Sequence, residues 1–177
     1  MSAAVLDFWR AAGPDKWFTK DAGFDAEIRA RFLDDYEAAA QGGRTDWEAT
    51  PEGALALVIV LDQFPRNMFR NSARAFAADP LAHAVADRAL GRGFDQQVPA
   101  RERTFFYLPF EHSENMADQE RALALFRATG DADLVKWAEL HADIIRRFGR
   151  FPHRNSVLGR VSTAEELRFL AEGGFAG

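Results

Sequence analysis

Apolar side chains recur at helical spacing over most of the chain. The first long run starts at Asp21 and ends at the glycine pair 42–43, with charged residues on its opposite side. Its apolar positions lie four residues apart, at Phe24, Ile28, Phe32 and Tyr36. This spacing predicts an amphipathic helix with one buried face, which the glycines end.

The next run is apolar on every side. Residues 54–61 contain no polar side chain, and Thr50-Pro51 before them suits a helix N-terminus. The Val-Ile-Val stretch in this run would also suit a buried strand. We favour a helix, because the cap and the length up to Phe64 support it. Pro65 is expected to end or kink this helix.

Caps and breakers predict the remaining helices. Asp79, Asn115 and Asp131 are N-cap residues, and the last helix has a capping box at 162–166, Ser162 with Glu165 or Thr163 with Glu166. The expected limits are 79–90, 100–110, 115–130, 131–149 and 162–171. We therefore predict an all-α protein of seven or eight helices in antiparallel hairpins, forming a single domain over residues 1–177.

One predicted helix, 131–149, has a histidine on its apolar stripe. The stripe consists of Leu134, Trp137, Ala138, His141, Ile145 and Phe148. His141 is therefore expected to face other helices, either as a core histidine with satisfied nitrogens or as part of a site.

Composition narrows the class of protein. The 177 residues include no cysteine, which excludes disulfides and cysteine nucleophiles and favours the cytoplasm. The longest apolar stretch has eight residues, short of the ~20 that a membrane span needs, and the first residues lack a signal-peptide pattern. The net charge of −5 argues against binding to nucleic acid. Common cofactor, hydrolase and zinc motifs are absent, so neither a cofactor nor a resident metal is expected.

Polar residues interrupt the helical pattern in three segments, the first at 61–67. Asp62, Arg66 and Asn67 stand at the end of the most apolar helix, where polar groups must be paired. The segment is either part of a site or a structural ion pair that fixes the bend at Pro65.

The second segment, 108–114, ends an aromatic helix in ionisable residues. His112 and Glu114 would serve acid–base chemistry or bind a metal. The alternative is a capping loop in which Ser113 or Asn115 starts the next helix.

The third segment, 145–155, is rich in arginine. Residues 141–160 contain five Arg and one Asp, a local charge of +4 that leaves −9 for the rest of the chain. Guanidinium groups on a turn bounded by Gly149 and Pro152 suit a carboxylate or phosphate. The alternatives are internal pairing with carboxylates such as Asp62 or Glu114, and, less favoured by the overall charge, nucleic acid.

These segments together resemble a known family. The resemblance rests mainly on three segments, residues 61–67, 107–114 and 148–155. It also rests on residues 158–160 and 162–166, farther along the chain, and on residues 5–9 near the N-terminus. They are similar to the uncharacterised bacterial family known as domain of unknown function 924, over nearly the whole chain. The resemblance implies an all-helical fold like that of tetratricopeptide repeats, and it implies no known activity.

We expect the three segments to meet in one cleft that binds a small anionic molecule or a peptide carboxylate. The predicted ligand-binding residues are Arg66, Asn67, Arg150, His153, Arg154 and Asn155. The residues predicted to orient the ligand or move protons are Asp62, His112, Glu114 and His141. One alternative is a hydrolase that uses these four with water or a weakly held metal. Another is a scaffold in which every segment is an internal network.

Overall fold

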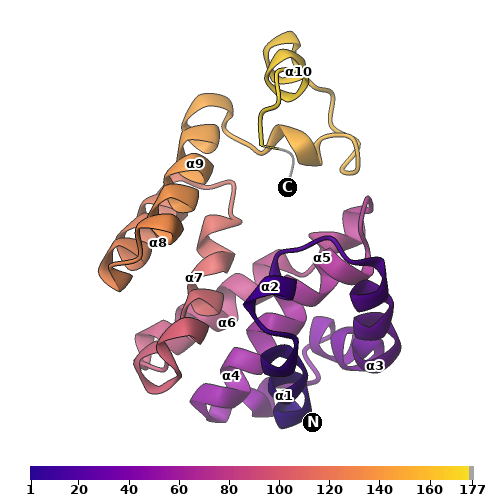
Figure 1. Ribbon diagram of the computed structural model, residues 1–177, viewed down its shortest axis with the longest axis vertical. Coiled ribbons are helices and arrows are strands. Elements are labelled where there is room, and N and C mark those ends of the chain that lie inside the picture. Colours follow the sequence, from indigo (N-terminus) through magenta and orange to yellow (C-terminus); the bar gives the residue numbers. More distant parts are fainter. Residues whose placement is uncertain (176–177) are drawn as a thin grey trace. The chain divides into compact units, whose positions relative to one another are not determined.

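The computed structural model describes residues 1–175, and this part of the chain consists of helices joined by short turns, without a strand (Figure 1). The predicted all-α class is thereby confirmed. The chain divides into two compact units, the first formed by Met1–Arg70 and Arg74–Pro109 and the second by Asn71–Ala73 and the residues from Phe110 onward. The single domain and the tetratricopeptide-like array stay predictions.

The first unit holds the N-terminal helices. They are α1 (Ser2–Ala12), α2 (Pro14–Trp17), α3 (Ala22–Ala40), α4 (Pro51–Val58), α5 (Phe64–Met68), α6 (Asp79–Gly91) and most of α7 (Thr104–Glu111). Short 3₁₀ turns lie at η1 (Thr45–Ala49), η3 (Ala73–Ala75), η4 (Asp95–Gln97) and η5 (Ala100–Glu102). The chain passes from the first unit to the second within α7, between Pro109 and Phe110.

The central element of the first unit is α4. The Thr50 side chain accepts a hydrogen bond from the Gly53 N–H at 3.1 Å, so the predicted cap is present and the helix interpretation of this run is confirmed. Every residue of α4 from Gly53 to Val58 is buried, because α1 and α6 pack against it. A helix that is apolar on all sides requires such an enclosed position.

Pro65 changes the type of helix instead of ending it. After α4 the chain continues as a π-helical turn, η2 (Ile59–Gln63), and then as α5, whose first turn contains Pro65. In the wide turn the Phe64 N–H donates to the carbonyl of Ile59, five residues back. Proline is tolerated in the first turn of a helix because its missing N–H is not needed there.

The second unit is built on one helical hairpin. Helices α8 (Met116–Thr129) and α9 (Ala132–Phe148) are joined by Gly130, with φ of 74°, and Asp131, and they pack side by side (Figure 1). The turn η6 (Pro152–Arg154) and helix α10 (Ala164–Ala171) follow. Ile144, Ile145 and Phe151 form a buried cluster in the core of this unit.

Most predicted caps of the second unit are confirmed. The side chains of Asn115 and Asp131 accept backbone hydrogen bonds at the starts of α8 and α9. Of the two capping boxes considered for α10, the one formed by Thr163 and Glu166 is present. Glu166 is 2% exposed, so this cap is also a buried contact.

Two local predictions are wrong. Trp137 is 51% exposed, although its neighbours Ala138 and His141 on the predicted stripe of α9 are buried. Asp79 does not cap α6. The N-cap of α6 is Ala78, and the Asp79 carboxylate pairs with Arg66 instead.

Among the described residues, no helix combines the length and the apolarity required to cross a membrane.

The close approach of α4 to η1 gives a direct test of the packing. A Cβ atom at Gly53 would lie 2.1 Å from the carbonyl oxygen of Trp47, whereas one at Gly91 would meet nothing within 4 Å. We expect Gly53→Ala to lower the free energy of unfolding by about 2 kcal/mol. Gly91→Ala, the control, should leave it unchanged or raise it by less than about 1 kcal/mol. Urea denaturation measures both, and equal effects would contradict the described packing.

Candidate functional site

The first polar segment forms a closed ion-pair network in the first unit. Asp62, 1% exposed on the π-helical turn, lies 3.2 Å from the Arg66 guanidinium. Arg66 also donates two hydrogen bonds to Asp79, at 2.9 and 3.0 Å. Burial alone would lower the pKa of Arg66, but the charges of Asp62 and Asp79 outweigh it and raise the pKa. Arg66 is therefore a charged residue held by two carboxylates of its own unit.

Asn67 is also engaged inside the first unit. Its side-chain amide donates to the Asp25 carboxylate at 2.8 Å, and the same carboxylate pairs with Arg70. Asn67 thus joins α5 to α3, whereas Arg66 joins α5 to the π-helical turn and to α6. This outcome matches the structural pair that the sequence left open as an alternative.

In the second unit, Glu114 joins the second polar segment to the third. Its carboxylate accepts hydrogen bonds from Arg160 at 2.6 and 2.9 Å and from the Phe151 N–H at 2.7 Å. Burial would raise the pKa of Glu114, but the hydrogen bonds from Arg160 and Phe151 and the charges of Arg160 and Arg154 together lower it. A carboxylate held in this way stays ionised at neutral pH and is a poor general acid.

Two other predicted ligand-binding residues, Arg150 and Asn155, are held inside the second unit. Arg150 donates to both oxygens of Glu166, at 2.7 and 2.9 Å. The hydrogen bond from Arg150 is the main cause that lowers the pKa of Glu166 to about 2. Asn155, 1% exposed, donates to Ser162 and accepts from Arg160. Both residues therefore fix the loop between η6 and α10.

His141 is positioned by a carbonyl and a buried carboxylate. Its Nδ1 lies 2.8 Å from the Trp137 carbonyl oxygen and 3.4 Å from Oε1 of Glu111. Because a carbonyl oxygen only accepts hydrogen bonds, Nδ1 carries the proton, and Nε2 is the acceptor in the neutral ring. Glu111 was not among the predicted site residues, although the neighbouring pair Glu111-His112 in the sequence was a signal for it.

Three of the four histidines of the chain gather in the second unit. The rings of His141 and His153 each lie 5.6 Å from the Phe151 ring, and His112 lies 6.4 Å from His141. The Arg154 guanidinium covers Phe151 at 4.5 Å. We call these four residues, His112, His141, His153 and Arg154, the histidine cluster.

The turn that carries His112 is fixed by a residue that sequence reasoning missed. Gln119 of α8 is completely buried, and its amide donates to the carbonyls of Glu111 and Ser113, both at 2.6 Å. These bonds satisfy carbonyls at the end of α7, where the helix can no longer do so. A lone glutamine on an amphipathic helix gives no sequence signal for such a role.

Within residues 1–175, no group of three or more histidine, aspartate or glutamate side chains is arranged to hold a metal ion.

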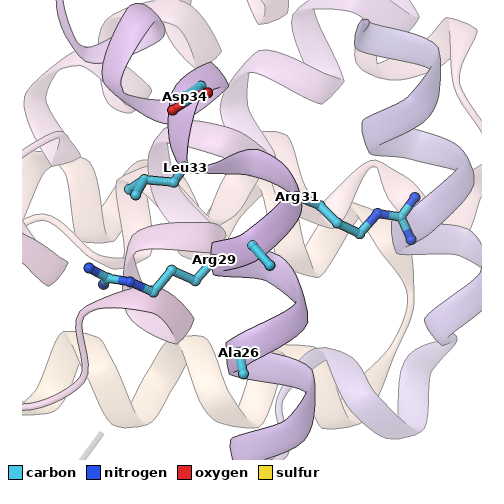
Figure 2. A pocket seen from close by; sticks show the side chains of 6 residues that line it. Ala26, Arg29, Arg31, Leu33 and Asp34 are labelled. Atoms are coloured by element: carbon cyan, nitrogen blue, oxygen red, sulfur yellow. The ribbon is translucent and has the colours of Figure 1, made fainter.

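Two shallow hollows lie on the first unit, and none of the predicted site residues lines them. One, of about 430 Å³, is lined by residues of a single helix, α3. Figure 2 shows the Arg29 and Arg31 side chains leaving this helix on opposite sides. Arg29 donates to the carbonyl of Met68, and Arg31 pairs with Glu27. The second hollow, of about 380 Å³, lies between α1, α2 and α3 beside Lys16 and Phe24. Asp7, Glu27 and Arg31 also line the second hollow, which therefore presents both signs of charge.

Comparison with known proteins places the chain in a family. Residues 5–174 match the family described as "Bacterial protein of unknown function (DUF924)". The chain belongs to this family. A solved structure of a protein of unknown function from Agrobacterium tumefaciens is similar over 97% of both chains, with 50% identity and a TM-score of 0.94. No match was found among curated proteins.

The ion pairs of this DUF924 protein differ in burial, and their effects on stability should differ accordingly. We expect Arg66→Met to lower the free energy of unfolding by about 3 kcal/mol, because it leaves the buried Asp62 charge uncompensated. The matched control is Arg127→Met, since Arg127 and Glu139 are an exposed pair at 3.1 Å. That change should cost less than about 1 kcal/mol. If urea denaturation gives the same loss for both, the network is not structural.

The pair formed by Arg150 and Glu166 predicts a pH dependence. The pKa of Glu166 in the folded chain, about 2, is lower than in the unfolded chain, so its contribution is complete above about pH 5 and disappears as the pH falls toward 2. We expect Glu166→Gln to destabilise the protein at pH 7, by about 2 kcal/mol. The difference from the unchanged protein should shrink as the pH falls toward 2. Thermal unfolding followed at several pH values measures it, and a difference independent of pH would contradict the assignment.

Proposed function

We propose that this DUF924 protein binds a small anionic molecule or a peptide carboxylate at the histidine cluster of its second unit. One observation carries the proposal: two imidazole rings and the guanidinium of Arg154 surround a single aromatic ring, Phe151, with a third imidazole beside them. A charged guanidinium beside imidazole rings and an apolar wall is typical of sites for anions with an organic part.

The guanidinium of Arg154 is suited to the main role in this site. It is stacked on Phe151, and Arg154 is only 7% exposed, so its orientation is fixed before a ligand arrives. A planar, oriented guanidinium binds a carboxylate or phosphate through two parallel hydrogen bonds. Preorganisation of this kind reduces the entropy that binding costs.

The surroundings of Phe151 determine the choice of ligand-binding residues. The His153 ring lies 5.6 Å from the Phe151 ring, and the Arg154 guanidinium covers the same ring. We assign ligand contact to these two residues, with His112 and His141 beside them. The other predicted ligand-binding residues hold the packing of their own units; they are Arg66, Asn67, Arg150 and Asn155. Glu114 orients the loop that carries Arg154, through its bond to the Phe151 N–H.

The hydrolase alternative has weaker support. Glu114 and Asp62 are held by arginines, so the proton transfer assigned to them would have to pass to Glu111 and His141. Glu111 and His141 form an oriented carboxylate–imidazole pair, but they lack an identified nucleophile. Binding requires no further group, and we rank it first. The absence of cysteine supports the cytoplasm as the compartment we propose.

The proposal is tested by titrating the full chain with sodium phosphate and with sodium acetate at constant ionic strength. The histidine ring signals are followed by NMR. We expect saturable shifts at His112, His141 and His153 and none at His83, the remaining histidine, which lies on α6 of the first unit. Equal shifts at all four rings would indicate nonspecific association and would contradict the proposal.

A pair of arginine variants locates the anion. Arg154→Gln should weaken binding about tenfold or more, equivalent to roughly 1.4 kcal/mol. Arg147→Gln is the matched control, because Arg147 belongs to the same arginine-rich segment but forms an exposed pair with Glu165 at 2.8 Å. It should bind as the unchanged protein does. Identical titrations of the Arg154 variant and the control would overturn the assignment, provided that circular dichroism shows both to be folded.

A further inference from the structure

The histidine cluster already surrounds an aromatic side chain of the same unit. The Phe175 ring lies 4.6 Å from the His141 ring and 5.2 Å from the His153 ring, with interplanar angles of 65° and 82°. These are edge-to-face arrangements, which aromatic rings prefer to face-to-face stacking. Phe175 also packs against the core formed by Ile144, Ile145 and Phe151. The space between the two imidazoles is therefore a seat for one aromatic ring.

The backbone before Phe175 directs it to this seat. Gly173 has φ of 82°, a conformation that favours glycine, and the Gly174 N–H donates to the Phe169 carbonyl at 2.9 Å. A Cβ atom at Gly174 would lie 2.5 Å from that carbonyl oxygen and 2.7 Å from the Phe169 ring. Only glycine fits this turn, so the sequence after α10 fixes the direction in which the chain leaves the helix.

The ring seat and the anion-binding group share one wall. Phe151 lies 5.6 Å from His141 and from His153, the two rings that also contact Phe175, and the Arg154 guanidinium covers Phe151 at 4.5 Å. A ligand that joins an aromatic ring to a carboxylate through a short linker would therefore fill the seat and meet the guanidinium together. A simple inorganic anion would use only the second of these contacts.

We infer that the ligand of the histidine cluster is an aromatic carboxylate and that Phe175 occupies the seat of its ring. The inference rests on the proposed anion binding and specifies its ligand class. The shared chemistry is a phenyl ring one or two carbons away from a carboxylate, present in a free aromatic acid and in a peptide that ends in phenylalanine. Entry of either ligand displaces Phe175, so the protein's own side chain competes with the ligand.

The test compares two independent ways of emptying the seat. Phe175→Ala removes the ring. Gly174→Ala keeps the phenylalanine in the chain but moves its ring out of the seat, because the added Cβ clashes with Phe169. We expect both variants to bind 3-phenylpropanoate at least ten times more tightly than the unchanged protein, measured by calorimetry and by the His141 and His153 signals. Acetate should bind equally to all three. Phe18→Ala, which removes a 65% exposed ring in the first unit, is the control and should change nothing.

Two further ligands complete the design. N-acetylphenylalanine represents the end of a peptide, and tighter binding of it than of 3-phenylpropanoate to the Phe175→Ala variant would identify a peptide as the source of the carboxylate. The uncharged 3-phenylpropanol should bind this variant at least ten times more weakly than the acid, since it has no carboxylate for Arg154. Equal affinity of the variant for the alcohol and the acid would show that the seat is unrelated to anion binding, and it would overturn the inference.

The remaining outcomes separate the inference from the proposed function. If neither variant gains affinity for the aromatic acids while acetate and phosphate still shift the cluster, the inference is wrong and the proposed function stands. If no anion shifts the cluster in any of the proteins, both are wrong. Near-ultraviolet circular dichroism establishes that each variant is folded, and having two variants keeps the test decisive if one of them is not.

Discussion

The second unit depends on the carboxylate of Glu114. It accepts hydrogen bonds from the side chain of Arg160 and from the backbone of Phe151, which lie on either side of the turn η6. One charged group thereby fixes the loop that carries His153 and Arg154 to the start of the hairpin α8–α9. The ion pair of Arg150 with Glu166 then attaches α10 to the same loop. The proposed anion site is thus positioned by charges that it does not itself use.

Helices and their ends could be predicted from the sequence because they depend on local contacts. The caps at Thr50, Asn115 and Asp131 involve residues two or three positions away, within reach of any local pattern. Trp137 was wrongly assigned to the buried stripe of α9, because the spacing of apolar residues in the sequence does not show where that stripe ends. The π-helical turn was missed because Pro65 alone does not show how the helix before it adjusts.

Partners distant in sequence could be predicted only in part, since Glu114 was proposed as a partner for the arginines of the third segment but not for a particular one. The arginines of the third segment stood out as a local excess of charge, but the glutamates that neutralise Arg150 and Arg160 lie 16 and 46 residues away from them. Phe175 lies outside all three polar segments, so nothing in the sequence connected it with His141. Of the predicted ligand-binding residues, His153 and Arg154 are the two that the proposed anion site keeps. Their apolar neighbour Phe151 belongs to the same segment of the sequence.

The π-helical turn makes the polar network of the first unit sensitive to length as well as to chemistry. A π turn is wider than an α turn, and it has the geometry of an α-helix into which one residue has been inserted. Because the bulge absorbs the extra residue, the helix from Phe64 onward keeps the direction it would have without it. Loss of Gln63 would remove the bulge and leave Asp62 three residues from Arg66 instead of four, although neither residue of the pair had changed its identity. In this part of the chain, the number of residues is as much a constraint as their type.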